Sequence, residues 1–299
     1  MSDQPGLPRT PIVERLDARL RGPGSIARID ADDFATLTRE TGLDQAALLV
    51  ACLPWAQRWA RAPLSNFKVG AAALAGSGAL YLGANIEFGA LPLAQTVHAE
   101  QSVIAHAQSC GETRLRALAT SAAPCGFCRQ FMLELPEPRP ILILADHGPV
   151  ELSELLPWAF GPTQLGRAPE LLCAGPHGLR LLGDGLGDGR GDGLVALALA
   201  AADRSNAPYT GALSGVALTT QTGQRFAGAV AESAAYNPTL APMQAAVIAL
   251  HHGGGLVEQI ERAVLVELDQ APVSQLDGAA AVLASLAPTA TLTRTLASA

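Results

Sequence analysis

The sequence predicts an α/β protein made of two copies of one three-layer fold, each a mixed β-sheet with helices on both faces, after a small helical N-terminal segment. Helical and strand periodicities alternate along the chain, several short segments recur at a constant offset, and 299 residues suffice for two domains. We expect four parts: an N-terminal helical segment 1–48, a first domain 49–165 with the candidate metal ligands, a Gly-rich linker 166–195, and a degenerate second domain 196–299.

The N-terminal part is predicted to be mostly helical. Residues 11–20 carry apolar side chains at helical spacing, and Asp30 or Asp32 could cap the following helix. The Ala/Leu-rich stretch 44–60 predicts a further helix, which Pro54 crosses.

The pattern changes to short β segments after these helices. Residues 67–74 and 79–83 predict two strands, and Ala75-Gly76-Ser77-Gly78 between them is typical of a hairpin turn. The elements expected next are a helix after His98, a strand at 117–122, a helix after Cys125 and a strand at 141–144. This order gives a mixed sheet with helices on its faces.

Two short motifs in the first domain carry candidate metal ligands. His98 and Glu100 lie in Val97-His98-Ala99-Glu100-Gln101, and Cys125 and Cys128 form a C-x-x-C pair after Pro124. One imidazole and two thiolates are ligands that Zn²⁺ prefers, and three protein ligands leave a fourth tetrahedral position for water. The motifs therefore predict one catalytic Zn²⁺ per chain, held by His98, Cys125 and Cys128.

The spacing of the first motif separates its two polar residues. His98 and Glu100 lie roughly 200° apart around a helix axis, so Glu100 is a poor second ligand. At the first turn of a helix it can instead overhang the metal-bound water. Both ligand groups precede helical stretches, where the helix dipole favours the thiolate forms of Cys125 and Cys128. The alternatives are a redox dithiol and a coincident His with an unligated C-x-x-C, and nothing in redox chemistry requires the His-Ala-Glu motif.

Composition limits the partners. The formal net charge is −7, only 4% of residues are aromatic, and no Lys/Arg-rich tract occurs. We therefore expect no nucleic-acid partner, and a neutral small substrate fits better. Residues 1–11 lack the apolar core of a signal peptide, and the longest apolar run, 194–202, is too short to span a membrane. With five cysteines, an odd count, these features predict a cytoplasmic protein without a membrane partner.

A Gly-Asp-Gly repeat occupies residues 183–193. It is too rich in glycine to hold regular structure, which favours a linker or a surface loop. Calcium binding by its aspartates is the alternative, but the spacing and closing Glu of an EF-hand are absent.

The chain partly repeats itself after this stretch. At one offset, Ala62-Pro63-Leu64-Ser65 pairs with Ala207-Pro208-Tyr209-Thr210, Gly70 with Gly215, Gly83-Ala84 with Gly228-Ala229, and Glu87 with Glu232. Such self-similarity indicates two copies of one fold. In the second copy Pro242-Met243-Gln244 replaces His-Ala-Glu, and the Cys pair is missing. We interpret this copy as serving packing and subunit contacts.

Together, the H-x-E and P-C-x-x-C motifs, the duplication and the length resemble the cytidine deaminase family in its long, two-domain homodimeric form. The densest matches are 65–70, 83–88, 96–102 and 124–132. The resemblance implies a cytidine deaminase-like fold. It also implies zinc-dependent hydrolytic deamination of cytidine and 2′-deoxycytidine to uridine and 2′-deoxyuridine, a pyrimidine-salvage reaction that releases ammonia.

The resemblance also assigns site residues. It implies that Glu100 is the catalytic proton carrier. Asn85 and Glu87 match the pair that hydrogen-bonds the ribose hydroxyls, and Phe67 matches the ring beside the pyrimidine. Phe160 matches a second ring that lines the site, and Ala99 completes the predicted substrate-binding set.

The same resemblance implies a homodimer in which the 234–236 turn of the partner closes the pocket. Two features depart from the family pattern. Lys68 stands where some relatives have a neutral polar residue, and the Gly-Asp-Gly insertion is longer than expected.

Two other functions fit part of the pattern. Another zinc deaminase would act on a nucleotide, free cytosine or adenosine in tRNA, but the 85–96 loop lacks the Arg or Lys that a phosphate needs. A non-catalytic zinc-stabilised binding protein would need a closed site, and no fourth Cys or His lies at ligand spacing.

Overall fold

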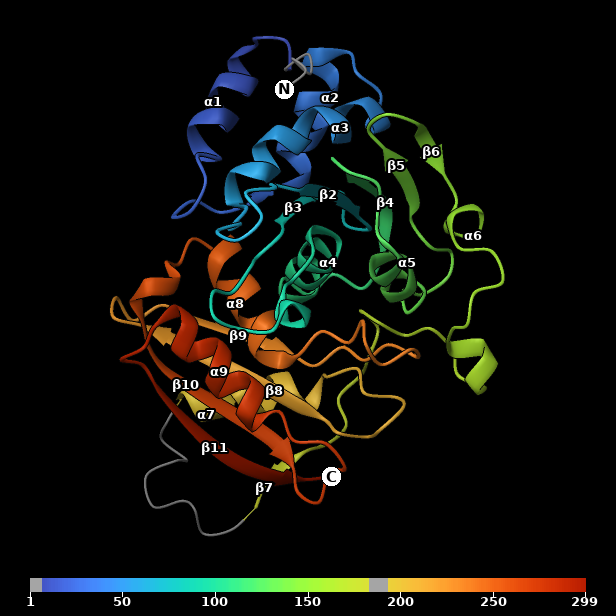
Figure 1. The fold of residues 1–299 in the computed structure, drawn as a ribbon. Helices are drawn as coiled ribbons and strands as arrows, with labels where there is room; N and C mark the ends of the chain where they lie inside the picture. The colour runs from blue at the N-terminus through green and yellow to red at the C-terminus, as the bar shows by residue number, and fades with distance from the viewer. Residues whose placement is uncertain (1–6, 183–192) are drawn as a thin grey trace.

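The computed structural model describes residues 7–182 and 193–299. It contains two sheets with α4 and α8 between them, and the N-terminal helices cover the outer face of the first sheet (Figure 1). The Gly-Asp-Gly prediction at 183–193 falls outside the described residues except for Gly193. In the part of the chain that the structure describes, no helix combines the length and apolarity needed to cross a bilayer.

Side-chain caps start two of the three N-terminal helices, which are α1 (Pro11–Arg19), α2 (Ala31–Thr41) and α3 (Gln45–Ala56), followed by η1 (Gln57–Trp59). Thr10 accepts the Val13 N–H at α1, and Asp44 accepts the Ala47 N–H at α3. Asp30, rather than Asp32, is the N-cap residue of α2. The helix predicted over 44–60 ends as an α-helix at Ala56, two residues after Pro54.

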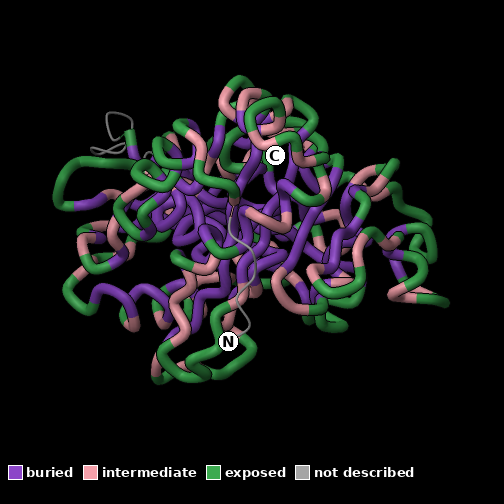
Figure 2. The backbone as a smooth tube through the Cα atoms, turned by 90° about the horizontal axis from the view of Figure 1, so that it is seen from above, coloured by how far each residue is buried: buried purple, intermediate pink, exposed green. Residues whose placement is uncertain are grey.

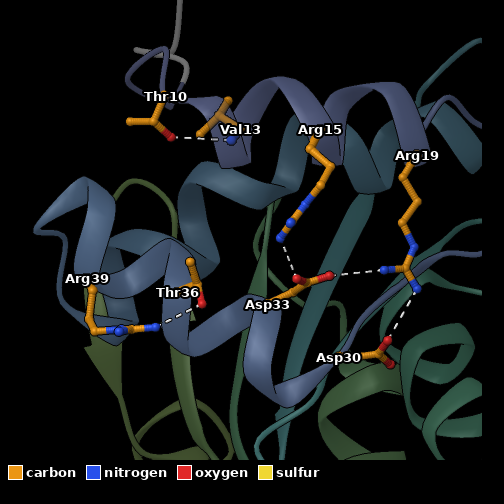
Figure 3. Close-up of polar contacts among 8 residues, drawn as sticks. All are labelled: Thr10, Val13, Arg15, Arg19, Asp30, Asp33, Thr36 and Arg39. Atoms are coloured by element: carbon orange, nitrogen blue, oxygen red, sulfur yellow. Dashed lines mark hydrogen bonds and ion pairs between the residues drawn. The ribbon is translucent and has the colours of Figure 1, made fainter.

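Ion pairs join α1 to α2 (Figure 3). Arg15 contacts Asp33 at 2.5 Å, and Arg19 reaches both Asp33 at 3.1 Å and Asp30 at 3.4 Å. These charges lie at the surface, where such pairs contribute at most about 1 kcal/mol each, so they orient the helices more than they stabilise them.

The first sheet has the strand order β1-β3-β2-β4-β5-β6. Its strands are β1 (Arg28–Ile29), β2 (Gly70–Ala75), β3 (Leu80–Ala84), β4 (Leu115–Thr120), β5 (Ile141–Leu144) and β6 (Gly148–Val150). Only β4 and β5 run parallel. The helices α4 (Ala99–Ser109) and α5 (Gly126–Met132) follow β3 and β4, and α6 (Leu152–Leu155) follows β6.

The strand predicted over 67–74 is wrong at its start, because β2 begins only at Gly70. The preceding residues are held by one side chain instead of by a strand ladder. Asn85 accepts the Val69 N–H through Oδ1 at 2.9 Å and donates through Nδ2 to the Phe67 carbonyl at 2.9 Å.

The second sheet has the order β7-β11-β10-β8-β9, in which β9, β8, β10 and β11 repeat the arrangement of β3, β2, β4 and β5, and no described strand corresponds to β1. Its strands are β7 (Arg180–Leu181), β8 (Ser214–Thr220), β9 (Arg225–Ala229), β10 (Ile260–Leu268) and β11 (Thr291–Ser298). The helices are α7 (Gly193–Asp203), α8 (Pro242–His252) and α9 (Leu276–Leu286), and short 3₁₀ turns form η2 (Leu93–Gln95), η3 (Pro162–Leu165) and η4 (Val257–Gln259). The four domain boundaries stay predictions; β7, inside the stretch interpreted as linker, pairs with β11.

Paired glycines show why the two copies keep the same spacing. A Cβ at Gly83 would lie 2.4 Å from the Val103 nitrogen of α4, and one at Gly228 would lie 2.1 Å from the Ala246 nitrogen of α8. Each helix backbone therefore lies directly on its strand, which only glycine permits. The predicted duplicated α/β fold is confirmed.

Three histidines of α4 and α8 are buried beside Trp59 of η1, within the buried interior that Figure 2 shows in purple. The ring of His252 stacks beside Trp59 and lies 5.3 Å from the ring of His106. His106 Nδ1 contacts the Leu82 carbonyl at 2.9 Å, and His251 Nε2 contacts the Trp59 carbonyl at 2.8 Å. Burial lowers the pKa of His106 to about 4, that of His251 below its usual value, and that of His252 well below it.

We expect this cluster to make the fold sensitive to acid. The histidines are neutral when folded but charge near pH 6.5 when unfolded, so the unfolded chain binds more protons below that pH. The free energy of unfolding should fall from about pH 6.5 towards pH 4, by at most about 1.4 kcal/mol per pH unit per histidine.

Urea unfolding between pH 7 and pH 5 measures this slope. In the variant His106→Gln the slope of the unfolding free energy against pH should be smaller by the contribution of about one proton. The variant His147→Gln, in the exposed turn between β5 and β6, should have the wild-type slope. An unchanged slope in His106→Gln would contradict the assignment.

Candidate metal and substrate site

The three predicted ligands come together at the starts of two helices. His98 is the N-cap residue of α4, Cys125 is the N-cap residue of α5, and Cys128 lies in the first turn of α5. The prediction that both ligand groups precede helices is therefore confirmed. The strands that precede these helices, β3 and β4, run in the same direction on either side of β2, so α4 and α5 begin near each other at one edge of the first sheet (Figure 1).

Their atoms fit one face of a zinc tetrahedron. His98 Nδ1 lies 3.3 Å from Cys125 Sγ and 3.4 Å from Cys128 Sγ, and the two sulfurs are 3.6 Å apart. Ordinary Zn–N and Zn–S bonds at tetrahedral angles require about 3.6 Å and about 3.8 Å for these edges. Within the two described ranges, this is the one group of three or more His, Cys, Asp or Glu residues close enough to hold a metal ion.

The electrostatics of the cluster favour a cation. Hydrogen bonds from Cys128 and from His98 lower the pKa of Cys125 to about 3. The bond to Cys125, together with burial, raises the pKa of Cys128, and the bond to Cys125 raises the pKa of His98. The two sulfurs thus share one proton, which a dication can replace while releasing it to solvent.

Glu100 lies in the first turn of α4 and is only 4% exposed. Burial raises the pKa of its carboxyl group, so the carboxyl is better able to hold a proton than a surface glutamate. The side chain borders a cavity of about 270 Å³, which Cys125 and His98 also border. This places a group able to accept and donate protons beside the metal ligands.

The cavity brings together most of the predicted substrate-binding residues. It is lined by Ser65, Phe67, Val69, Asn85, Glu87, Thr96, His98, Ala99, Glu100, Ala122, Ala123 and Cys125. Phe67 is 62% exposed at its mouth. Phe160 does not line it, and lies in the exposed loop after α6.

Asn85 and Glu87 are already bonded within the chain. Asn85 holds the 67–69 segment, as described above, and Glu87 accepts hydrogen bonds from the backbone N–H groups of Leu64 and Ser65 and from the Ser65 hydroxyl. Glu232 makes the same three bonds with Tyr209 and Thr210 in the second copy. Holding this turn is therefore a structural task that does not depend on the metal site.

Sequence reasoning missed Arg129, which braces the metal-site loop. Its Nε donates to the Pro124 carbonyl at 2.8 Å, and its NH1 nitrogen donates to the Leu155 carbonyl at 2.7 Å. The adjacent Gln130 donates to the Phe160 carbonyl at 2.6 Å. Their position directly after Cys128 was the available signal, but residue types alone do not show which carbonyls they reach.

Two family models match the chain. Both are described as the cytidine and deoxycytidylate deaminase zinc-binding region, and they match residues 44–143 and 152–280. A cytidine deaminase of Sodalis glossinidius (strain morsitans) is 46% identical over 265 residues, which is 86% of this chain and 86% of that protein. The chain belongs to the cytidine and deoxycytidylate deaminase family.

Family membership confirms the resemblance, zinc as the cofactor and the prediction of a hydrolytic deaminase. Solved structures of shorter proteins also match. The cytidine deaminase from Mycobacterium tuberculosis is 35% identical and covers 40% of this chain and 99% of its own, with a TM-score of 0.36. That from Burkholderia pseudomallei is 31% identical and covers 40% of this chain and 100% of its own, with a TM-score of 0.35.

The ligand assignment makes a testable prediction about metal content. Cys125→Ala and Cys128→Ala should each leave the purified protein with far less than one zinc per chain, because two ligands cannot hold the ion tightly. Cys173→Ala, at an exposed cysteine outside the cluster, is the matched control and should keep its zinc. Elemental analysis after gel filtration measures the zinc content per chain. One zinc per chain in Cys128→Ala would refute the assignment of Cys128 as a ligand.

Proposed function

We propose that this chain deaminates cytidine and 2′-deoxycytidine hydrolytically, yielding uridine or 2′-deoxyuridine and ammonia. The observation that carries this proposal is the single cavity bordered by His98, Cys125 and Glu100 at one side and by Asn85 and Glu87 at another. A metal centre and a polar clamp for a sugar thus face the same small space, as a nucleoside substrate requires.

The metal ligands would be His98, Cys125 and Cys128, whose two thiolates balance the charge of the ion. When bound, Zn²⁺ supplies an acidic water, with a pKa of about 7. Glu100 takes a proton from the attacking water and delivers it to N3 of the base. It then carries another proton to the departing amino group at C4, so one carboxyl acts as base and acid in turn. The raised pKa of Glu100 suits this relay.

Asn85 and Glu87 keep hydrogen-bonding capacity for the ribose. Asn85 Nδ2 has a second hydrogen beyond the one given to Phe67, and the Glu87 carboxylate has lone pairs beyond those used by Leu64 and Ser65. The turn therefore fixes both side chains before substrate arrives, and Phe67 borders the space for the base. Ala99, between His98 and Glu100, supplies backbone to the wall.

A nucleotide substrate is the second candidate, because the family description includes deoxycytidylate deaminases. A phosphate would need a cation beside the sugar clamp. Among the described residues that line the cavity there is no Lys or Arg, which favours the nucleoside.

We also propose a homodimer in which the partner's 234–236 turn covers the cavity. Tyr236 is 60% exposed with a backbone φ of +61°, and Trp158 is fully exposed with a φ of +57°, so both present aromatic surface in strained conformations. Phe160 lies in the same loop as Trp158. Sedimentation at twice the 30.7 kDa chain mass would support the dimer, and a monomer would refute it. Free thiols at all five cysteines suit the proposed cytoplasmic location.

Ultraviolet absorbance tests the reaction directly. Zinc-loaded protein should remove the cytidine band and release ammonia, with little change for CMP, cytosine or adenosine. Glu100→Ala should keep its zinc but lose turnover by about 10² to 10⁴-fold, since the proton relay is gone. Exposed Glu151→Ala is the control. Turnover of CMP but not of cytidine would show that the substrate is a nucleotide. Wild-type turnover by Glu100→Ala would refute the role of Glu100 in proton transfer.

The turns held by Glu87 and Glu232 allow the effect of a substitution on substrate binding to be distinguished from its effect on stability. Glu87→Gln and Glu232→Gln remove the same bonds from equivalent turns, so both should lower the melting temperature by similar amounts. Only Glu87→Gln should raise the KM for cytidine, because Glu87 alone lines the cavity. Thermal unfolding and steady-state kinetics of the two variants measure this; equal effects on KM would leave Glu87 a purely structural residue.

A further inference from the structure

The outer edge of β9 carries backbone groups that have no partner. Hydrogen bonds from Val230 N to the Ser214 carbonyl at 3.1 Å and from Thr220 N to the Gln224 carbonyl at 3.0 Å show which residues of β9 face β8. The even-numbered residues of β9 thus pair with β8, and the N–H and C=O groups of Ala227 and Ala229 point away from it. Within residues 7–182 and 193–299, nothing bonds these four groups.

At the equivalent edge in the first copy, three of the four outward backbone groups have partners. At the same offset, Leu82 and Ala84 take the places of Ala227 and Ala229. Leu82 donates its N–H to the Ala27 carbonyl at 2.9 Å, its carbonyl contacts His106 Nδ1, and the Ala84 N–H reaches the Ser102 hydroxyl at 3.3 Å. A short extended segment therefore completes the first sheet.

That segment runs between the strand edge and the end of a helix of the other copy. Residues 28–29 form β1 and pair with β3, Ile26 bridges to Gly253, and the Ala27 N–H donates to the His252 carbonyl at 2.8 Å. The segment thus fills the groove between β3 and the C-terminal end of α8.

The internal symmetry places the matching groove between β9 and the C-terminal end of α4, where the structure has a cavity of about 390 Å³. It is lined by Ala227, Gly228 and Ala229, by Ala105, Gln108, Ser109, Gly111, Glu112 and Thr113, by Leu172 and Ala174, and by Leu197, Ala200, Ala201, Arg204 and Ala245. Residues 172–174 are the counterparts of 27–29. Leu172 and Ala174 line this cavity without pairing with β9, and Cys173 between them donates to the Thr113 carbonyl.

We propose that this cavity is a docking site for an extended peptide segment, which adds a strand to the free edge of β9. Another extended backbone satisfies Ala227 and Ala229 together, because its own N–H and C=O groups alternate with the same spacing. The equivalent groove between β3 and the C-terminal end of α8 is filled by a peptide segment that main-chain hydrogen bonds hold in place.

The walls define the chemistry of the peptide. Alanines dominate the cavity, so small apolar side chains fit. Arg204 lines it, is exposed, and makes no ion pair within the described chain, which favours an acidic residue at one end of the peptide. The edge between Ala227 and Ala229 spans about 7 Å, which matches roughly three docked residues.

The probe is a capped hexapeptide with the sequence of residues 25–30, Ser-Ile-Ala-Arg-Ile-Asp. This is the sequence that fills the equivalent groove between β3 and α8. Titration calorimetry on the full zinc-loaded chain should show saturable binding. Amide hydrogen exchange in residues 225–229 should slow by at least about tenfold at saturation. The same peptide N-methylated at its alanine is the ligand control and should not bind.

Two variants test the location. Ala227→Pro removes an outward-facing N–H, which an edge strand tolerates, so it should fold and lose the peptide. Ala201→Leu fills the cavity from α7 and should also block binding. Both should retain wild-type zinc content and melting temperature within a few degrees.

Three results would overturn the proposal. The first is the absence of saturable binding at millimolar peptide. The second is undiminished binding by both variants. The third is strong protection of residues 225–229 without peptide, which would mean that the edge is already covered.

Discussion

The direct contact of helix backbone on strand backbone at Gly83 is the constraint from which the metal site follows. With α4 seated against β3 there, its first turn ends at the sheet edge, so His98 and Glu100 meet the start of α5. A side chain at Gly83 would push α4 outward and move His98 away from sulfurs that lie 3.3 Å and 3.4 Å from it. Precision of ligand geometry thus depends on a residue that touches no ligand.

The second copy shows which features belong to the fold and which belong to the chemistry. It keeps the glycine contacts at Gly215 and Gly228 and the Glu232 turn, yet has Gln244 where Glu100 stands in the first copy. Features shared by both copies serve packing, and of these only Glu87 also borders the cavity. The differences, namely the ligands, Glu100 and Asn85, mark the groups used in the proposed reaction.

Sequence reasoning recovered the duplicated α/β fold and the metal ligands because both depend on local spacing, as in His98 to Glu100 and Cys125 to Cys128. It placed the start of β2 at Phe67 because alternating apolar residues look like a strand, whereas the Asn85 side chain takes the hydrogen bonds that a ladder would use. The brace from Arg129 and the open edge at Ala227 depend on distant backbone groups. No residue pattern encodes such partners, so only the three-dimensional arrangement reveals them.

The buried histidine and tryptophan cluster joins η1, α4 and α8, so each copy supplies part of the interior of the other. A chain shortened to its first copy would leave His106 and Ser102 facing water across a surface shaped for another helix of the same kind. Such a fragment has one ready substitute for α8, the α4 of a second fragment. The long chain thus carries within itself, in covalent form, the helix-to-helix contact that two separate fragments would have to make as independent molecules.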